Sequence, residues 1–207
     1  MASTIVGVCD LLDRFPYDST PKVLPVGLDQ IKLHLLIDHN ADDALLEGEG
    51  GLGGLIIAAA NEVERRGSVA FIKQKRRLVI DDEPVGCVTV ALPNGPIIGL
   101  LEVKYIDSDG NEQTMPASAY RFSAKAGSIY FNSTVPYRAA GPGTLWIDYE
   151  CGLGTTASSV PVEWQVCIAT LAMRKFERRE GVAGQADDAW ERAFDRMVVA
   201  AGANRRY

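Results

Sequence analysis

The pattern of apolar residues changes twice along the chain, and this succession limits the folds that it can adopt. Helical spacing runs from Leu28 to Arg66, short β-branched and aromatic runs fill residues 70–150, and helical spacing returns at Pro161. A strand block between two helical segments predicts an α+β protein. We expect a helical core of about four helices with an inserted antiparallel β-strand block, and extended N- and C-terminal segments.

Capping and turn residues set the expected bounds of these elements. We expect helices at 28–38, 41–47, 55–66 and 161–180, with the strands lying between 70 and 150. Asn40 is the expected N-cap of the second helix. Five glycines between Gly48 and Gly54 would each cost a helix about 1 kcal/mol relative to alanine, so this stretch predicts a loop. Asp107-Ser-Asp-Gly110, between two β-type runs, predicts a hairpin.

The two C-terminal helical segments carry apolar stripes. The stripe of the first recurs at spacings of 4, 3, 4 and 3 and comprises Val162, Val166, Ala169, Met173 and Phe176. Trp164, Ile168 and Leu171 widen it, so we expect a helix that is buried on most sides. The second helix, from about Ala186 to Ala201, places Trp190, Phe194, Met197, Val198 and Ala201 on one face. We divide the chain into an arm at 1–26, a main domain at 27–180 and a C-terminal segment at 181–207.

Composition narrows the classes of function. A net charge of -6 argues against a nucleic-acid-binding module, although an acidic wall would let DNA slide past without sticking. Four scattered cysteines and two histidines make poor zinc ligands and fit a reducing compartment. No apolar run is long enough to span a membrane, and the N-terminus is a poor signal peptide. We therefore expect synthesis and folding in a cytoplasm and no membrane partner.

No motif predicts chemistry. Gly48–Gly54 lacks the Lys-Ser/Thr of a phosphate-binding loop, and Asp107–Gly110 lacks the helical context of a calcium loop. Asp81–Glu83 fits a solvated turn, and Arg174–Arg179, with its interleaved glutamate, fits a solvated helix face. His34 and His39 are five residues apart, which does not place both on one helix face. We expect no enzyme activity, no cofactor and no metal.

Four pieces of sequence, in order, carry a resemblance to a known family. They are Leu28–Asp38 with Asp42–Leu46, then Leu55–Glu64, then the strand block from Ile97 to Gly152, and last Val160–Trp164 opening a helix with basic residues at its end. Over residues 27–180 this order resembles the head–tail connector, or adaptor, proteins of long-tailed bacteriophages and gene transfer agents. The glycine-rich insert, the ending after Arg66 and the long arm depart from the family pattern.

The resemblance implies a structural virion protein at the head–tail junction. Such subunits form a homo-oligomeric ring, usually twelve-fold, between the portal protein and the stopper or next neck protein. The ring joins head to tail and extends the channel for DNA, which passes without sequence-specific binding. Two alternatives remain open: another neck or tail-completion ring protein of the stopper type, and a small soluble ligand-binding domain.

The resemblance also implies a docking role for the C-terminal segment, which in this family commonly contacts the portal. An amphipathic helix followed by a polar tail suits such a contact, because a helix in a groove is held by anchors at i, i+3 and i+4. The portal-docking candidates are Trp190, Phe194, Met197, Val198, Arg205, Arg206 and Tyr207.

Overall fold

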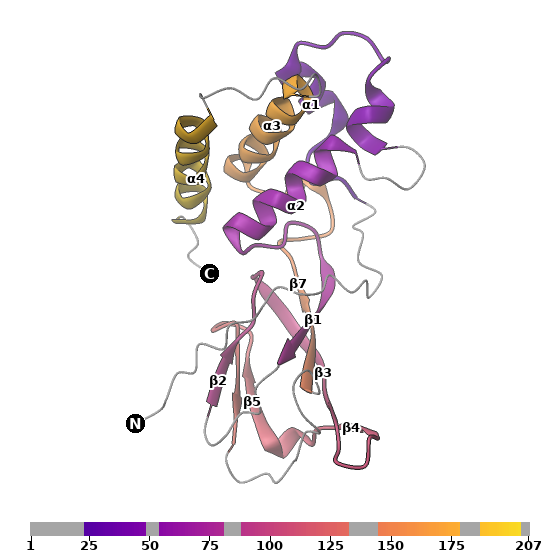
Figure 1. Cartoon of the computed structure of the whole chain (residues 1–207), viewed down its shortest axis with the longest axis vertical. Helices are drawn as coiled ribbons and strands as arrows, with labels where there is room; N and C mark the ends of the chain where they lie inside the picture. The colour runs from indigo at the N-terminus through magenta and orange to yellow at the C-terminus, as the bar shows by residue number, and fades with distance from the viewer. Residues whose placement is uncertain (1–22, 49–53, 81–87, 133–144, 179–186, 204–207) are drawn as a thin grey trace. The chain divides into compact units, whose positions relative to one another are not determined.

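The computed structural model describes residues 23–48, 54–80, 88–132, 145–178 and 187–203 (Figure 1). They divide into two compact units. The strand unit comprises the described residues between Lys73 and Gly152, and the helical unit comprises those up to Ile72 and from Leu153 onward. Helices and antiparallel strands both contribute, so the predicted α+β class is confirmed. Most of the expected arm at 1–26 lies outside the described residues.

The helical unit is built on the packing of α2 against α3, with α1 and α4 added to this pair. Its elements are α1 (Leu28–Leu35), the π-helical turn η1 (Ala44–Gly48), α2 (Leu55–Gly67), the 3-10 turn η3 (Ala157–Ser159), α3 (Val162–Glu177) and α4 (Asp187–Ala203). The Phe71 and Trp164 rings lie 5.5 Å apart at the centre of its core. A Cβ on Gly67 would lie 2.7 Å from Trp164 Cη2, so α2 needs glycine where it meets α3.

The first two helices are shorter than predicted. The expected helix at 28–38 ends at Leu35, because Leu36 adopts the left-handed conformation with φ 57°. The expected helix at 41–47 is replaced by the single π-helical turn Ala44–Gly48. Asn40 does not cap it as predicted, since the Asn40 side chain instead accepts a hydrogen bond of 2.6 Å from Lys32 Nζ. Lys32 also pairs with Asp43 at 2.8 Å, so its side chain links α1 to the segment just before η1.

The glycine-rich stretch does end one element and start another. Its middle lies outside the described residues, but the Gly54 amide donates to the Glu47 carbonyl at 3.3 Å, so the two sides of the loop come together. A Cβ on Gly54 would overlap the backbone of Leu46 and Glu47. Helix α2 then begins at Leu55, as predicted.

The strand unit contains two antiparallel sheets. The four-stranded sheet has the order β1-β7-β3-β4, and the three-stranded sheet has the order β2-β6-β5. The strands are β1 (Gln74–Ile80), β2 (Val88–Ala91), β3 (Ile97–Ile106), β4 (Glu112–Thr114), β5 (Tyr120–Ser123), β6 (Ser128–Phe131) and β7 (Leu145–Cys151), with the 3-10 turn η2 (Ala117–Ala119) between β4 and β5. Residues 145–149 of β7 are all buried, which explains their near-continuous apolar sequence.

The predicted hairpin at Asp107-Ser-Asp-Gly110 is confirmed, and it joins β3 to β4. Asp107 Oδ1 accepts hydrogen bonds from the amides of Asp109 and Asn111 at 3.0 and 2.9 Å. Gly110 takes the positive φ of 83° that the turn requires.

The stripe predicted for α3 is confirmed only in part. Ala169 is buried and Phe176 packs against the core, and the residues expected to widen the stripe, Trp164, Ile168 and Leu171, are buried as well. The two valines of the stripe are not buried. Val162 and Val166 are 69% and 42% exposed. The buried side chains are Trp164, Cys167, Ile168, Ala169, Leu171 and Ala172, so the helix is buried on one side rather than on most sides. Two apolar stripes share this helix, and the larger side chain, Trp164, occupies the core beside Phe71. Burial of the larger apolar surface is favoured.

Candidate functional site

The C-terminal helix α4 packs on α2 and α3 within the helical unit. Phe194, Val198 and Ala201 are only 2%, 3% and 8% exposed, and Trp190 and Met197 are partly buried against the same core. The predicted apolar face of this helix therefore exists. In this structure, however, it covers the core of its own chain.

Stacked rings and cations hold this face in place. The Trp190 and Phe194 rings are stacked, with centroids 5.0 Å apart and planes inclined by 6°. The Arg66 guanidinium of α2 lies 5.2 Å from the Phe194 ring centroid. Arg174 of α3 lies 5.1 Å from the centroid of Trp190. Each contact combines apolar burial with a cation–π attraction of about 0.5–1 kcal/mol.

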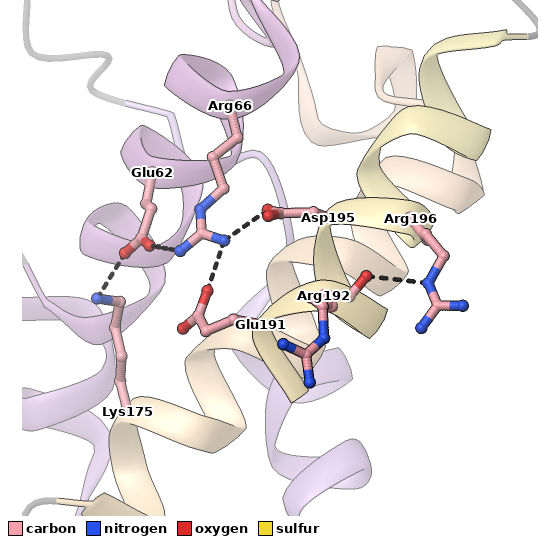
Figure 2. Close-up of polar contacts among 7 residues, drawn as sticks. All are labelled: Glu62, Arg66, Lys175, Glu191, Arg192, Asp195 and Arg196. Carbon is pink, nitrogen blue, oxygen red and sulfur yellow. Dashed lines mark hydrogen bonds and ion pairs between the residues drawn. The ribbon is translucent and has the colours of Figure 1, made fainter. Parts of the chain in front are cut away.

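A group of charged side chains, which we call the Arg66 cluster, completes the contact: Glu62, Arg66, Lys175, Glu191 and Asp195 (Figure 2). Arg66 Nη1 donates to Glu191 Oε2 at 2.7 Å and to Asp195 Oδ1 at 2.8 Å. Arg66 Nη2 donates to Glu62 Oε1, and Lys175 Nζ lies 2.9 Å from the other oxygen of Glu62. Glu191 and Asp195 are one turn apart on α4, so one guanidinium binds both.

The charges of the cluster support one another. Burial by itself lowers the pKa of Arg66, but hydrogen bonds to Glu191, Glu62 and Asp195 outweigh it and raise the pKa above its ordinary value. Burial raises the pKa of Glu62, but the hydrogen bonds from Lys175 and Arg66 outweigh this effect. The pKa of Glu62 therefore lies below its ordinary value. Glu62 and Arg66 are therefore both charged near neutral pH.

This arrangement bears on the predicted docking residues. Phe194 and Val198 are unavailable to a partner while α4 keeps this position. The side of α4 that faces solvent carries Val199, which is 70% exposed, together with Arg192 and Arg196. Arg205, Arg206 and Tyr207 lie outside the described residues, and the docking role of the whole segment stays a prediction.

Sequence reasoning found the face of α4 but missed what holds it. The pairing of Glu62 with Arg66 follows the i, i+4 rule and could have been found in the sequence. Arg66 and Glu191, by contrast, are 125 residues apart, and no local signal joins them.

The described residues contain no group of three or more His, Cys, Asp or Glu side chains that could hold a metal ion. His34 and His39 are both exposed, while Asp81–Glu83 lies outside the described part. Burial raises the pKa of the Cys167 thiol to about 11, which leaves it protonated at neutral pH. In the same described part of the chain, no helix has the length and apolarity needed to cross a membrane.

Comparisons with known proteins identify solved structures that have a similar fold. No family model and no curated protein sequence matches the chain. Among solved structures, a chain in the neck of an empty GTA particle computed with C6 symmetry matches with TM-score 0.65 and 21% identity, over 87% of this chain and 92% of that one. A chain of the native gene transfer agent virion matches with TM-score 0.62 and 20% identity, over 86% and 93%.

A third match is a chain in the neck of the native GTA particle computed with C12 symmetry, with TM-score 0.61 and 22% identity, over 86% of this chain and 90% of that one. All three matches span most of both chains, so both the helical unit and the strand unit take part in the likeness. The chain thus has the fold of a protein from the neck of gene transfer agent particles, which is the kind of fold that its resemblance to head–tail connectors predicted.

Proposed function

We propose that this protein is a structural subunit of the neck of a phage or gene transfer agent particle. The observation that carries the proposal is the fold shared with chains of two gene transfer agent necks, over 92% and 90% of the length of those chains. The order of four sequence segments, which resembles that of connectors, supports the same class of virion protein.

The subunit forms a homo-oligomeric ring in this proposal. The neck structures that resemble it were computed with C6 and C12 symmetry. A cyclic ring is closed by heterologous contacts, so two different faces of the subunit must be complementary. A subunit made of two compact units offers a separate surface on each.

The position assigned to the ring is between the portal protein and the stopper, where it joins head to tail and extends the DNA channel. A net charge of -6 suits a channel wall that does not retain phosphates. DNA passes without sequence-specific binding, and the role is structural rather than enzymatic. The protein is made in the host cytoplasm and ends in the virion.

The C-terminal segment is the proposed contact with the portal. Because Phe194 and Val198 hold α4 to its own core, we assign the contact to the solvent-facing side of α4, with Val199 at its centre, and to the residues that follow. Phe194 and Val198 then position the helix, and Trp190 and Met197 form the margin of the contact.

A stopper or other tail-completion ring protein is the alternative within the neck, since the matching structures contain whole necks or virions. The two positions differ in what the ring touches. A connector binds heads that carry only the portal, whereas a stopper binds only after the connector is present.

Electron microscopy distinguishes these positions. The purified protein is added to DNA-filled, tailless heads of its own particle that carry the portal and no other neck protein. We expect new ring density directly below the portal, with cyclic symmetry. Density that forms only after another neck protein is added would move this chain to the stopper position. If no density forms under either condition, the neck function is wrong.

A further inference from the structure

Each sheet of the strand unit ends in two edge strands, and one of these four edges differs from the others. Among the described strands, β1, β4, β2 and β5 each have a strand neighbour on one side only. Strand β1 has three basic residues, β4 begins with Glu112 after the acidic hairpin Asp107–Asn111, and β5 contains Arg121. Charges on an edge strand commonly protect it from pairing with another strand. Strand β2, Val88–Ala91, has no charge and no proline, and it pairs with β6 without a bulge.

The hydrogen bonding of β2 shows which of its backbone groups face outward. The Leu92 amide, directly after the strand, donates to the Gly127 carbonyl at 2.8 Å. Bonded and non-bonded pairs alternate along antiparallel strands, so Val90 also directs its backbone groups toward β6. The N–H and C=O groups of Thr89 and Ala91 therefore point away from β6, and both residues are exposed. In the described part of the chain, no strand lies along this outer edge.

The N-terminal arm contains a segment whose composition suits this edge. Residues Thr4–Val8 read Thr-Ile-Val-Gly-Val, so four of the five are β-branched and none is charged. Such residues favour strands. Outside the described residues, no other stretch of five has as many β-branched residues, and the rest of the arm carries charges and prolines. An uncharged edge strand and an uncharged strand-forming segment therefore occur in the same chain.

The arm is also long enough to reach the sheet. The residues 9–22 separate this segment from Val23, where the described part of the chain begins. Fully extended, they span about 45–50 Å. A unit of about 80 residues, such as the strand unit, has a diameter of about 30 Å. A tethered segment is present at an effective concentration in the millimolar range, so it competes well with a second copy at micromolar concentration.

From these observations we propose that Thr4–Val8 pairs with the outer edge of β2 in the same subunit and adds a fourth strand to the three-stranded sheet. The backbone groups of Thr89 and Ala91 supply the hydrogen bonds, as they do when an extended peptide is added to a sheet edge. The uncharged edge is then covered and is not open to the sheet of another molecule. This inference concerns a single subunit and does not depend on the proposed ring. It leaves the contacts between copies to other surfaces.

Amide exchange resolved by residue with NMR tests the pairing. The variant Ile5→Pro/Val6→Pro removes the N–H groups of two neighbouring residues, one of which must face β2. We expect the Thr89 and Ala91 amides to exchange at least roughly tenfold faster in this variant than in the wild-type chain. The Val90 amide is bonded to β6 in both proteins and should exchange at the same rate, which provides an internal reference.

A matched variant controls for the effect of proline in the arm. Asp18→Pro/Ser19→Pro places two prolines in the same arm but outside the strand-forming segment. Its Thr89 and Ala91 amides should exchange as slowly as in the wild-type chain. Cross-strand NOEs from residues 4–8 to Thr89 or Ala91 should identify the arm directly as the new neighbour of β2.

Three other results would overturn the inference. Thr89 and Ala91 amides that exchange equally fast in the wild-type chain and in Ile5→Pro/Val6→Pro would show that the edge is uncovered. Slow exchange that persists in this variant would assign the edge to another segment. Slow exchange that appears only as protein concentration rises would assign it to a second copy. None of these results bears on ring density below the portal, so the inference and the proposed function can fail separately.

Discussion

Arg66→Met removes the side chain through which α2 holds α4. Methionine keeps much of the apolar stem, and its helix propensity is close to that of arginine, so the change is confined to the charged head. Arg66 is 18% exposed and binds Glu62, Glu191 and Asp195 while it covers the Phe194 ring. Its loss leaves three carboxylates close together, of which Glu62 keeps its ion pair with Lys175.

The cost can be worked out from these contacts. The pair with Glu62 lies within α2, so it is not broken when α4 opens and does not enter the sum. Glu191 and Asp195 are 42% and 60% exposed, so solvent screens each of their pairs to about 0.5 kcal/mol or less. The contact with the Phe194 ring adds about 0.5 kcal/mol. The total is about 1.5 kcal/mol, which corresponds to a roughly tenfold increase in local opening of α4.

Native-state hydrogen exchange measures this opening directly. Local opening of α4 need not change the unfolding midpoint of the whole chain, whereas amide exchange reports on α4 itself. We expect amides in the middle of α4 to exchange faster in Arg66→Met, while those of β7 stay unchanged. Arg65→Met is the matched control, since Arg65 is the preceding residue of α2, has the same charge and is exposed. Equal exchange in α4 for both variants would refute this account of the Arg66 cluster.

Two further changes test the helical unit. The folded pKa of Glu62 lies below its ordinary value of 4.5, so its ion pairs stabilise the fold above about pH 4.5 and are lost as pH falls through the folded pKa. Glu62→Gln should therefore cost about 1 kcal/mol at pH 7 and make denaturant stability depend less on pH in acid; an unchanged acid limb would contradict this. Gly54→Ala should cost about 1–3 kcal/mol, because the added Cβ overlaps backbone at Leu46 rather than a movable side chain. Gly99→Ala, whose Cβ meets nothing within 4 Å, should leave the free energy of unfolding unchanged. Urea titration of both variants measures this, and equal losses for Gly54→Ala and Gly99→Ala would count against the packing argument.

The predictions from sequence succeeded where the cause is local. The Asp107–Gly110 turn is specified by a carboxylate that binds its own backbone and a glycine with positive φ, and both are visible in four letters. The start of α2 at Leu55 follows in the same way from the glycines before it. These features need no information from distant parts of the chain.

The predictions failed where the apolar pattern alone allowed more than one structure. In α3 two apolar stripes compete, and only contact with Phe71 and Gly67 selects the one that contains Trp164. Helix α1 stops at Leu35 although its apolar pattern continues, because Leu36 takes the left-handed conformation. Periodicity measures how apolar a face is, but it carries no record of what will be packed against that face.

By itself, the sequence determined the order of helices and strands, the hairpin, the glycine break and the resemblance to connectors, because these depend on neighbouring residues and their succession. Only the tertiary structure decided that the apolar face of α4 covers its own core and that Arg66 reaches Glu191 across 125 residues. It also placed the basic strand and the acidic hairpin at opposite edges of one sheet. Such contacts form because the folded chain brings distant segments together, and the free energy of each depends on both partners at once.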